Sequence, residues 1–184
     1  MLLKKRQKKL LQSLKNRGLR GVELVTSDAH EGIVYGLSKT FPEGPWQRCQ
    51  YHFTKNILDK TPKKYQEGLR SELQALFNSR DIKVANKKRD AIIEDYKDVA
   101  PSAMECLDRG YNEAMIVMEF PEKLRKLLRT SNHLERLNRE LKRRSKVIGV
   151  FPNEQSIIRL MGAVLMEINE GYECNVAPLF YHPV

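Results

Sequence analysis

The chain has 184 residues, of which 41% are hydrophobic and 30% are charged, the composition of a globular protein with one sizeable core. Its longest apolar stretch, residues 157–168, is interrupted by two charged residues, which excludes a transmembrane helix. The three cysteines, Cys49, Cys106 and Cys174, are odd in number and widely spaced. This spacing favours reduced thiols in a cytoplasmic protein.

Positive charge is concentrated in two blocks of the sequence. The 33 Lys and Arg residues exceed the 23 Asp and Glu residues by 10. Residues 1–20 contain basic residues and no acid, and residues 122–146 are strongly basic, whereas residues 81–113 are slightly acidic. Such blocks favour a polyanionic partner, most simply nucleic acid, because each phosphate that is neutralised releases counterions. A solvated helix surface is the alternative.

The first sixty residues predict a helix followed by a small α/β unit. Leucines near helical spacing predict a basic amphipathic helix over residues 2–17, which Gly18 ends in the left-handed conformation. Residues 22–26 predict a strand, and a tight loop then leads to a helix over residues 29–39. After a turn rich in Pro and Gly, residues 46–53 predict a second strand.

The remainder of the chain predicts helices. Thr61 and Pro62 predict a helix start, and three apolar stripes up to residue 120 predict a small all-helical subdomain. A short basic helix follows, then a helix that ends near Gly149 and a last helix from Asn153 to about residue 171. Residues 173–184 are interpreted as a tail.

Two carboxylates occupy positions that suit either catalysis or helix capping. Asp28 stands at the carboxyl end of the first predicted strand, where α/β sheets place reactive groups. Together with Glu31, three residues later, Asp28 also matches a capping box. Glu135 follows Asn132 by three residues, at the edge of its helix's apolar stripe, and the same two interpretations apply to it.

Cys49 and His52 form a C-x-x-H pair, which suggests zinc. A structural zinc site needs four ligands, and no second pair at finger-like spacing is found among the other candidates, Cys106, Cys174, His133 and His182. On a straight strand Cys49 and His52 would also face opposite sides. A zinc-stabilised module therefore remains a minor alternative, as does nucleophilic catalysis by Cys49 with His52. His30 and His182 have no assigned role.

Four segments occur in a specific order. They read LVTSDAHEG (residues 24–32), WQRCQYHF with a following KN (46–56), TSNHLERLNRE with a following RR (130–144), and GVFPN (149–153). In this order they closely resemble the Mutator-type transposases of bacterial insertion sequences, and the resemblance covers nearly the whole chain.

The resemblance implies a DDE recombinase on an RNase H-like fold with a helical insertion. The expected fold class is therefore α/β, predominantly helical, with short parallel strands and an all-α insertion. Residues 1–60 and 121–172 would form a partial RNase H-like catalytic domain, and residues 61–120 the insertion. The implied activity is DNA cleavage and strand transfer during transposition of an insertion sequence.

The resemblance also assigns residues. It places the family's second catalytic aspartate on Asp28 and its glutamate on Glu135, both as ligands of Mg²⁺ or Mn²⁺, and this favours catalysis over capping. Motif positions with a structural role fall on Cys49, His52 and Asn132. Backbone phosphates would be held by Arg136, Arg139, Lys142, Arg143 and Arg144. The implied partners are the ends of the element, target DNA and further copies of the intact enzyme, with no membrane.

The main departure from the family's pattern concerns the first catalytic aspartate. It lies on a strand upstream of the helix that begins here at Met1, so residues 1–184 are expected to be inactive alone. The sheet would also have an unpaired edge, which predicts marginal stability or self-association. The alternative from another class is a non-catalytic basic helical protein that binds DNA or a transposase subunit.

Overall fold

The computed structural model describes the backbone of residues 2–175 and the side chains of residues 6–132 and 134–170. The predicted tail lies almost wholly outside this range, as do the side chains of Cys174, His133 and His182. The chain divides into two units, Met1–Ser131 and Asn132–Val184. The described residues are predominantly helical with one two-stranded parallel sheet, and no helix among them is long and apolar enough to span a membrane.

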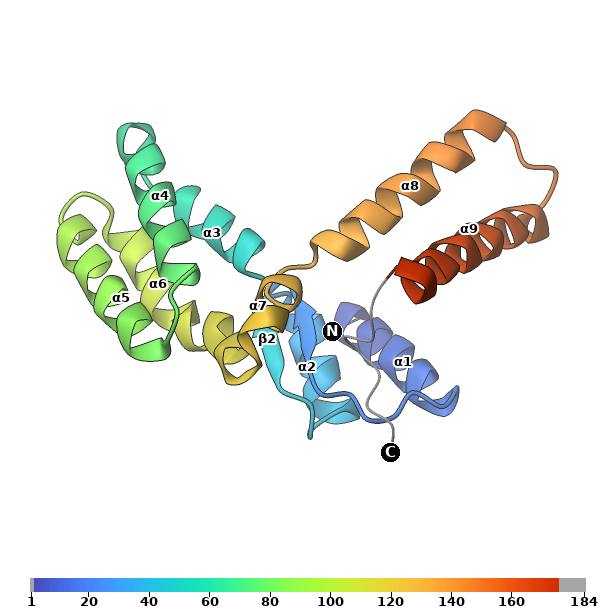
Figure 1. Ribbon diagram of the computed structural model, residues 1–184, viewed down its shortest axis with the longest axis horizontal. Coiled ribbons are helices and arrows are strands. Elements are labelled where there is room, and N and C mark those ends of the chain that lie inside the picture. Colours follow the sequence, from blue (N-terminus) through green and yellow to red (C-terminus); the bar gives the residue numbers. More distant parts are fainter. Residues whose placement is uncertain (1, 176–184) are drawn as a thin grey trace. The chain divides into compact units, whose positions relative to one another are not determined.

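The first unit contains most of the secondary structure (Figure 1). Its elements in chain order are α1 (Leu2–Asn16), β1 (Val25–Ser27), α2 (Glu31–Thr40), β2 (Trp46–Arg48), α3 (Gln50–Leu58), the 3₁₀ turn η1 (Lys63–Tyr65), α4 (Gln66–Phe77), α5 (Ile82–Tyr96), α6 (Pro101–Met115), the 3₁₀ turn η2 (Ile116–Glu119) and α7 (Glu122–Leu128).

Helix α1 ends as the sequence predicted. Gly18 has a φ of +104°, and two bonds close the turn around it. The N–H of Leu19 donates to the carbonyl of Leu14 at 3.1 Å, and the N–H of Gly18 donates to that of Lys15 at 3.1 Å. This is the Schellman pattern, which turns the chain back so that α1 packs against α2.

The sheet is smaller than predicted. Strands β1 and β2 pair in parallel, with Val25 opposite Trp46 and Ser27 opposite Arg48. The prediction of a strand over residues 46–53 is wrong beyond Arg48, because helix α3 begins at Gln50. Within α3 the apolar side chains recur at helical spacing and are buried, which offsets the β-prone composition of this run.

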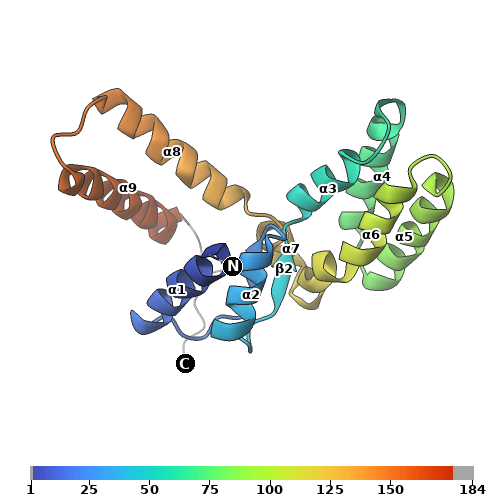
Figure 2. The ribbon, with the colours of Figure 1, turned by 180° about the vertical axis from the view of Figure 1, so that it is seen from behind.

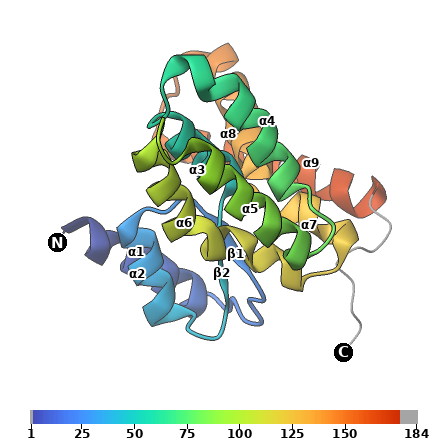
Figure 3. The same ribbon diagram turned by 90° about the vertical axis from the view of Figure 1, so that its left-hand side faces the viewer.

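Helices α3 to α6 enclose the hydrophobic core, and each packs against two of the others (Figure 3). The side chains of Leu69, Leu73 and Leu76, which the sequence placed on one stripe of α4, are fully buried. The predicted start of this helix at Thr61 is wrong, since α4 begins at Gln66 after a 3₁₀ turn. The Thr61 hydroxyl instead donates to the carbonyl of Ile57 at 2.9 Å.

Two buried glutamines attach this core to the sheet. The Gln47 amide donates to the carbonyl of Ala114 at 2.8 Å and accepts from the N–H of Val117 at 2.7 Å. Gln50 donates to the same Ala114 carbonyl at 2.8 Å. Because α6 gives way to the turn η2 at Ile116, these amides satisfy backbone groups that the end of the helix leaves open.

The second unit is a helical hairpin of α8 (Asn132–Ile148) and α9 (Glu154–Asn175), seen from behind in Figure 2. Gly149 follows α8 with a φ of +75°, at the predicted helix end. The last helix begins at Glu154, one residue after its predicted start, and the Asn153 side chain caps it by accepting a bond from the N–H of Ser156 at 2.9 Å.

Candidate functional site

Asp28 lies directly after β1, and its side chain is exposed. Helix α2 begins at Glu31, and its cap is His30, whose Nδ1 accepts from the N–H of Gly32 at 3.1 Å. The capping interpretation of Asp28 is therefore wrong. Within the described part of the chain, no hydrogen bond or ion pair occupies the Asp28 carboxylate, which is left facing solvent at the end of the strand.

The backbone that carries Asp28 is fixed by its neighbours. The indole N–H of Trp46 donates to the Ser27 hydroxyl at 2.9 Å, and this hydroxyl donates to the carbonyl of Asp28 at 2.8 Å. Trp46 belongs to β2, so this chain of bonds ties the two strands together just before the carboxylate. Hydrogen bonds of this kind, made by the residues that support a side chain, restrict the positions that the side chain can take.

Cys49 and His52 lie at the start of α3 rather than on a strand. Cys49 is the residue before the helix and His52 its third residue, so the straight strand on which they would face opposite sides is not formed. The Cys49 sulfur is fully buried and accepts from the N–H of Ser131 at 3.5 Å. Among the described side chains, no group of three or more His, Cys, Asp and Glu residues is arranged to hold a metal ion.

The segment that precedes α8 is bound to the carboxyl ends of both strands. The Thr26 hydroxyl donates to the carbonyl of Leu128 at 2.6 Å, and the N–H of Gln50 donates to that of Arg129 at 3.0 Å. Together with the Cys49 sulfur these bonds hold residues 128–131. Helix α8, which carries Glu135, begins with the next residue.

Helix α8 has one basic face. Glu135, Arg139, Lys142 and Lys146 follow each other at intervals of four, three and four residues, which places them on one side of an α-helix. The leucines of the predicted apolar stripe lie on another side. Glu135 therefore shares a helix face with cations.

The five predicted DNA-binding residues fall into two groups. Arg143 binds Glu140 through two bonds of 2.9 and 2.7 Å. Arg144 binds Glu140 at 2.8 Å and forms a bidentate pair with Glu167 of α9 at 2.8 and 2.9 Å. The bonds from Arg143 and Arg144 lower the pKa of Glu140 to about 2.

The second group consists of Arg136, Arg139 and Lys142. Their side chains are exposed, and none of them is paired with a carboxylate in the part of the chain that the structure describes. These three cations are the ones available to a polyanion, whereas Arg144 joins α8 to α9.

Comparison with known proteins decides the family. The family described as "Transposase, Mutator family" matches residues 4–174, nearly the whole chain. The chain belongs to the Mutator family of transposases.

Relatives of this transposase-family chain are named as transposases for insertion sequence elements. The transposase for insertion sequence element IS256 in transposon Tn4001 of Staphylococcus aureus is 41% identical over 161 residues, which are 86% of this chain and 41% of that protein. The transposase for element IS1081 of Mycobacterium tuberculosis is 38% identical over 156 residues, 85% of this chain and 38% of that protein. The chain spans about 40% of the length of these curated relatives.

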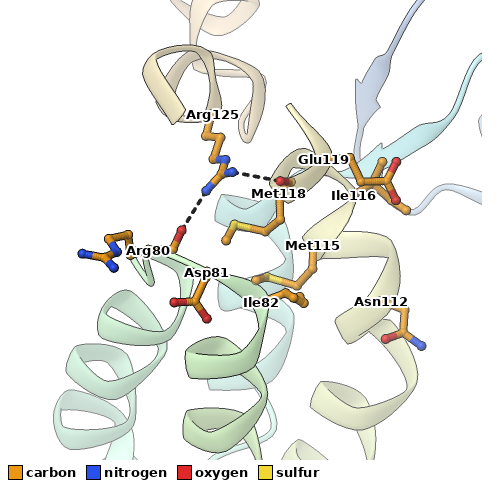
Figure 4. A pocket seen from close by; sticks show the side chains of 9 residues that line it. All are labelled: Arg80, Asp81, Ile82, Asn112, Met115, Ile116, Met118, Glu119 and Arg125. Atoms are coloured by element: carbon orange, nitrogen blue, oxygen red, sulfur yellow. Dashed lines mark hydrogen bonds between the residues drawn. The ribbon is translucent and has the colours of Figure 1, made fainter. Parts of the chain in front are cut away.

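Sequence reasoning missed the pockets of this transposase-family chain. One pocket, of about 520 Å³, lies in the first unit and is lined by none of the predicted site residues (Figure 4). Arg125 closes one side of it by donating to the carbonyls of Arg80 at 2.9 Å and Met118 at 3.0 Å. This member of the basic block thus serves the fold.

Proposed function

We propose that residues 1–184 form part of a DDE-type catalytic domain with a partial RNase H-like fold. In the intact enzyme this domain would cleave DNA and transfer strands during transposition of an insertion sequence. Family membership supports the proposal, since the relatives are transposases for insertion sequence elements. The observation that carries it is the exposed Asp28 carboxylate at the end of β1. This carboxylate does not cap α2, because His30 is the cap of that helix.

In this proposal Asp28 and Glu135 are metal ligands. An exposed carboxylate is the ligand type that Mg²⁺ and Mn²⁺ prefer, so Asp28 fits such an ion. When bound, a pair of these ions activates the attacking oxygen and stabilises the leaving oxygen of phosphoryl transfer. Asp28 belongs to the first unit and Glu135 to the second, so the sharing of ions by these two carboxylates is proposed from the family resemblance.

Three exposed cations of α8 would position DNA. Arg136, Arg139 and Lys142 are proposed to bind backbone phosphates, which sets the register of the duplex without reading its sequence. Arg144 keeps its predicted place near the DNA but acts through its pair with Glu167, which holds the hairpin. Binding of element ends, assembly into homo-oligomers and a cytoplasmic location remain predictions.

Metal titration tests the two carboxylates. Mn²⁺ binding to residues 1–184, followed by calorimetry, is expected to weaken in both the Asp28→Asn and the Glu135→Gln variants. The matched control is Asp108→Asn, an exposed aspartate of α6 that has no proposed role in the site. Binding that is unchanged in both site variants would instead favour the non-catalytic DNA-binding alternative.

Nicking of supercoiled DNA tests the expected third carboxylate. Two-metal transfer needs both ions at a fixed separation, and small positional errors cost on the order of 100-fold in rate. Residues 1–184 are therefore expected to nick no faster than their Glu135→Ala variant in Mg²⁺ or Mn²⁺. Nicking that depends on Glu135 would show that another acid completes the site, with Asp59 and Glu31 the first to test.

A further inference from the structure

A smaller hollow borders the carboxyl end of β1. It encloses about 350 Å³ and lies entirely within the first unit. Ala29, the neighbour of Asp28, lines it, and two aromatic side chains contribute to its wall, Tyr35 from α2 and Trp46 from β2. Because the hollow lies beside Asp28, a group that binds in the hollow would lie close to a ligand of the Asp28 carboxylate.

The two aromatic side chains are available to a ligand in different ways. The Tyr35 side chain is 44% exposed although it is large and apolar. The Trp46 side chain is half-buried and lines the hollow, and its indole N–H already donates to the Ser27 hydroxyl at 2.9 Å, which fixes the ring. Flat aromatic faces at an open hollow are the elements with which proteins stack single nucleobases.

The charge around the hollow favours a base over a backbone phosphate as its occupant. Glu31 and Glu113 line the hollow, and Glu113 is paired with Arg48 at 3.4 Å, so the lining has more negative than positive charge. The cations that suit phosphates lie elsewhere, on α1 and α8. The hollow and the basic faces are therefore complementary to different parts of a nucleotide.

We propose that this hollow binds one nucleobase of an unpaired DNA strand, stacked against Trp46 and Tyr35. The inference rests on the proposed function only in taking DNA as the ligand. A base outside the duplex stack is accommodated at a small unstacking cost, and for a single strand this cost is least. The hollow would thus fix the strand next to Asp28 independently of any metal.

Trp46 is the single tryptophan of the chain, so its fluorescence reports on this hollow alone. The probes are a single-stranded 12-mer of mixed sequence and an abasic 12-mer with the same phosphates, both titrated in EDTA. We expect the base-containing strand to quench Trp46 saturably and the abasic strand to leave it unquenched while still binding by anisotropy. Equal quenching by both probes would overturn the proposal.

Substitutions separate stacking from general binding. Tyr35→Ala is expected to weaken binding of the base-containing strand roughly 5- to 150-fold and to leave abasic binding unchanged. The matched control is Tyr51→Ala, which removes a tyrosine that is 54% exposed on α3 and outside the hollow. An equal loss in both variants, or none in Tyr35→Ala, would contradict the proposal.

Two further arms distinguish related outcomes. Asp28→Asn is expected to keep the quenching, so failure of the metal site and failure of the base site give different results. A duplex with one central mismatch tests whether the base can also come from paired DNA. Quenching by this duplex but not by its fully paired form would place a flipped base in the hollow, and quenching by the single strand alone would restrict the hollow to unpaired strands.

Discussion

The helical core of α3 to α6 and the hairpin of α8 and α9 are built on different principles. In the core, side chains such as Ile57, Leu69 and Leu107 are fully buried. Of the described hairpin side chains only Val164 is buried, whereas Ile158 and Leu165 of α9 are 67% and 43% exposed. A surface ion pair of Arg144 with Glu167 joins the two hairpin helices.

This difference assigns the stability of the fold to the core and the charged binding surface to the hairpin. Burial of apolar area contributes most of the free energy of folding, and exposed ion pairs contribute little and weaken with salt. Gln47 and Gln50 attach the sheet to this core through their bonds to the Ala114 carbonyl. The hairpin carries its charge at the surface, where phosphates can reach it.

Truncation of a leucine in each region should give the largest contrast. Leu73→Ala removes a fully buried side chain of α4 and is expected to lower the free energy of unfolding by about 2–5 kcal/mol. Leu165→Ala on the exposed side of α9 is expected to cost less than about 1 kcal/mol. Urea denaturation of both variants measures this, and similar losses would show that the hairpin is as well packed as the core.

Glycine to alanine substitutions should lower the stability of the protein in the core and raise it in the hairpin. A Cβ at Gly110 of α6 would lie 2.6 Å from the Phe53 ring, so Gly110→Ala is expected to destabilise by about 1–3 kcal/mol. A Cβ at Gly162 of α9 meets no atom within 4 Å, and Gly162→Ala is expected to stabilise by about 0.5–1 kcal/mol. Thermal unfolding would contradict the comparison if both changes moved the midpoint in the same direction.

Charge removal on α8 should distinguish its two groups of cations. The Arg139→Gln, Lys142→Gln double variant is expected to reduce the slope of log affinity against log salt for duplex DNA by about 1.8, or 0.9 for each phosphate contact. The Arg143→Gln, Arg144→Gln double variant has the same charge and removes side chains already paired with carboxylates. It should reduce the slope less. An equal reduction would argue against the division of these cations into a paired and an unpaired group.

Acid should weaken the hairpin before the core. The pKa of Glu140 falls from its ordinary 4.5 to about 2 because Arg143 and Arg144 bond to it, so its contribution to stability is present above pH 4.5 and is lost as the pH falls towards 2. Helix content by circular dichroism is expected to fall across this range more in the wild type than in Glu140→Gln. Parallel curves for the two proteins would refute the effect, which is the smallest of the four.

The helices could be predicted from the sequence because their signals are local. Apolar residues at helical spacing marked α4 to α6, and Gly18 and Gly149 marked two helix ends with positive φ. The end of β2 could not be predicted, since residues 46–53 suit a strand until the burial of α3 against α6 is taken into account. Tertiary packing decided that boundary.

In the candidate site, too, local features could be predicted from the sequence and features that depend on tertiary packing could not. Asp28 could be found from its place at a strand end, and its freedom from capping depended on His30, a residue seldom considered as a cap. The partner of Arg144 is 23 positions away on another helix, and no local pattern indicates it. The Trp46 bond to Ser27 depends on the pairing of β1 with β2 and was likewise hidden from the sequence.

Iron-directed cleavage tests most directly the proposal that Asp28 and Glu135 hold the same metal ions. Fe²⁺ replaces Mg²⁺ in such sites, and with ascorbate and peroxide it generates radicals that cut the backbone close to the ion. Residues 1–184 should be cut near position 28 and near position 135, and Glu135→Gln should remove both cuts together. Cuts at one position only, or a cut near residue 28 that persists in Glu135→Gln, would contradict a shared site.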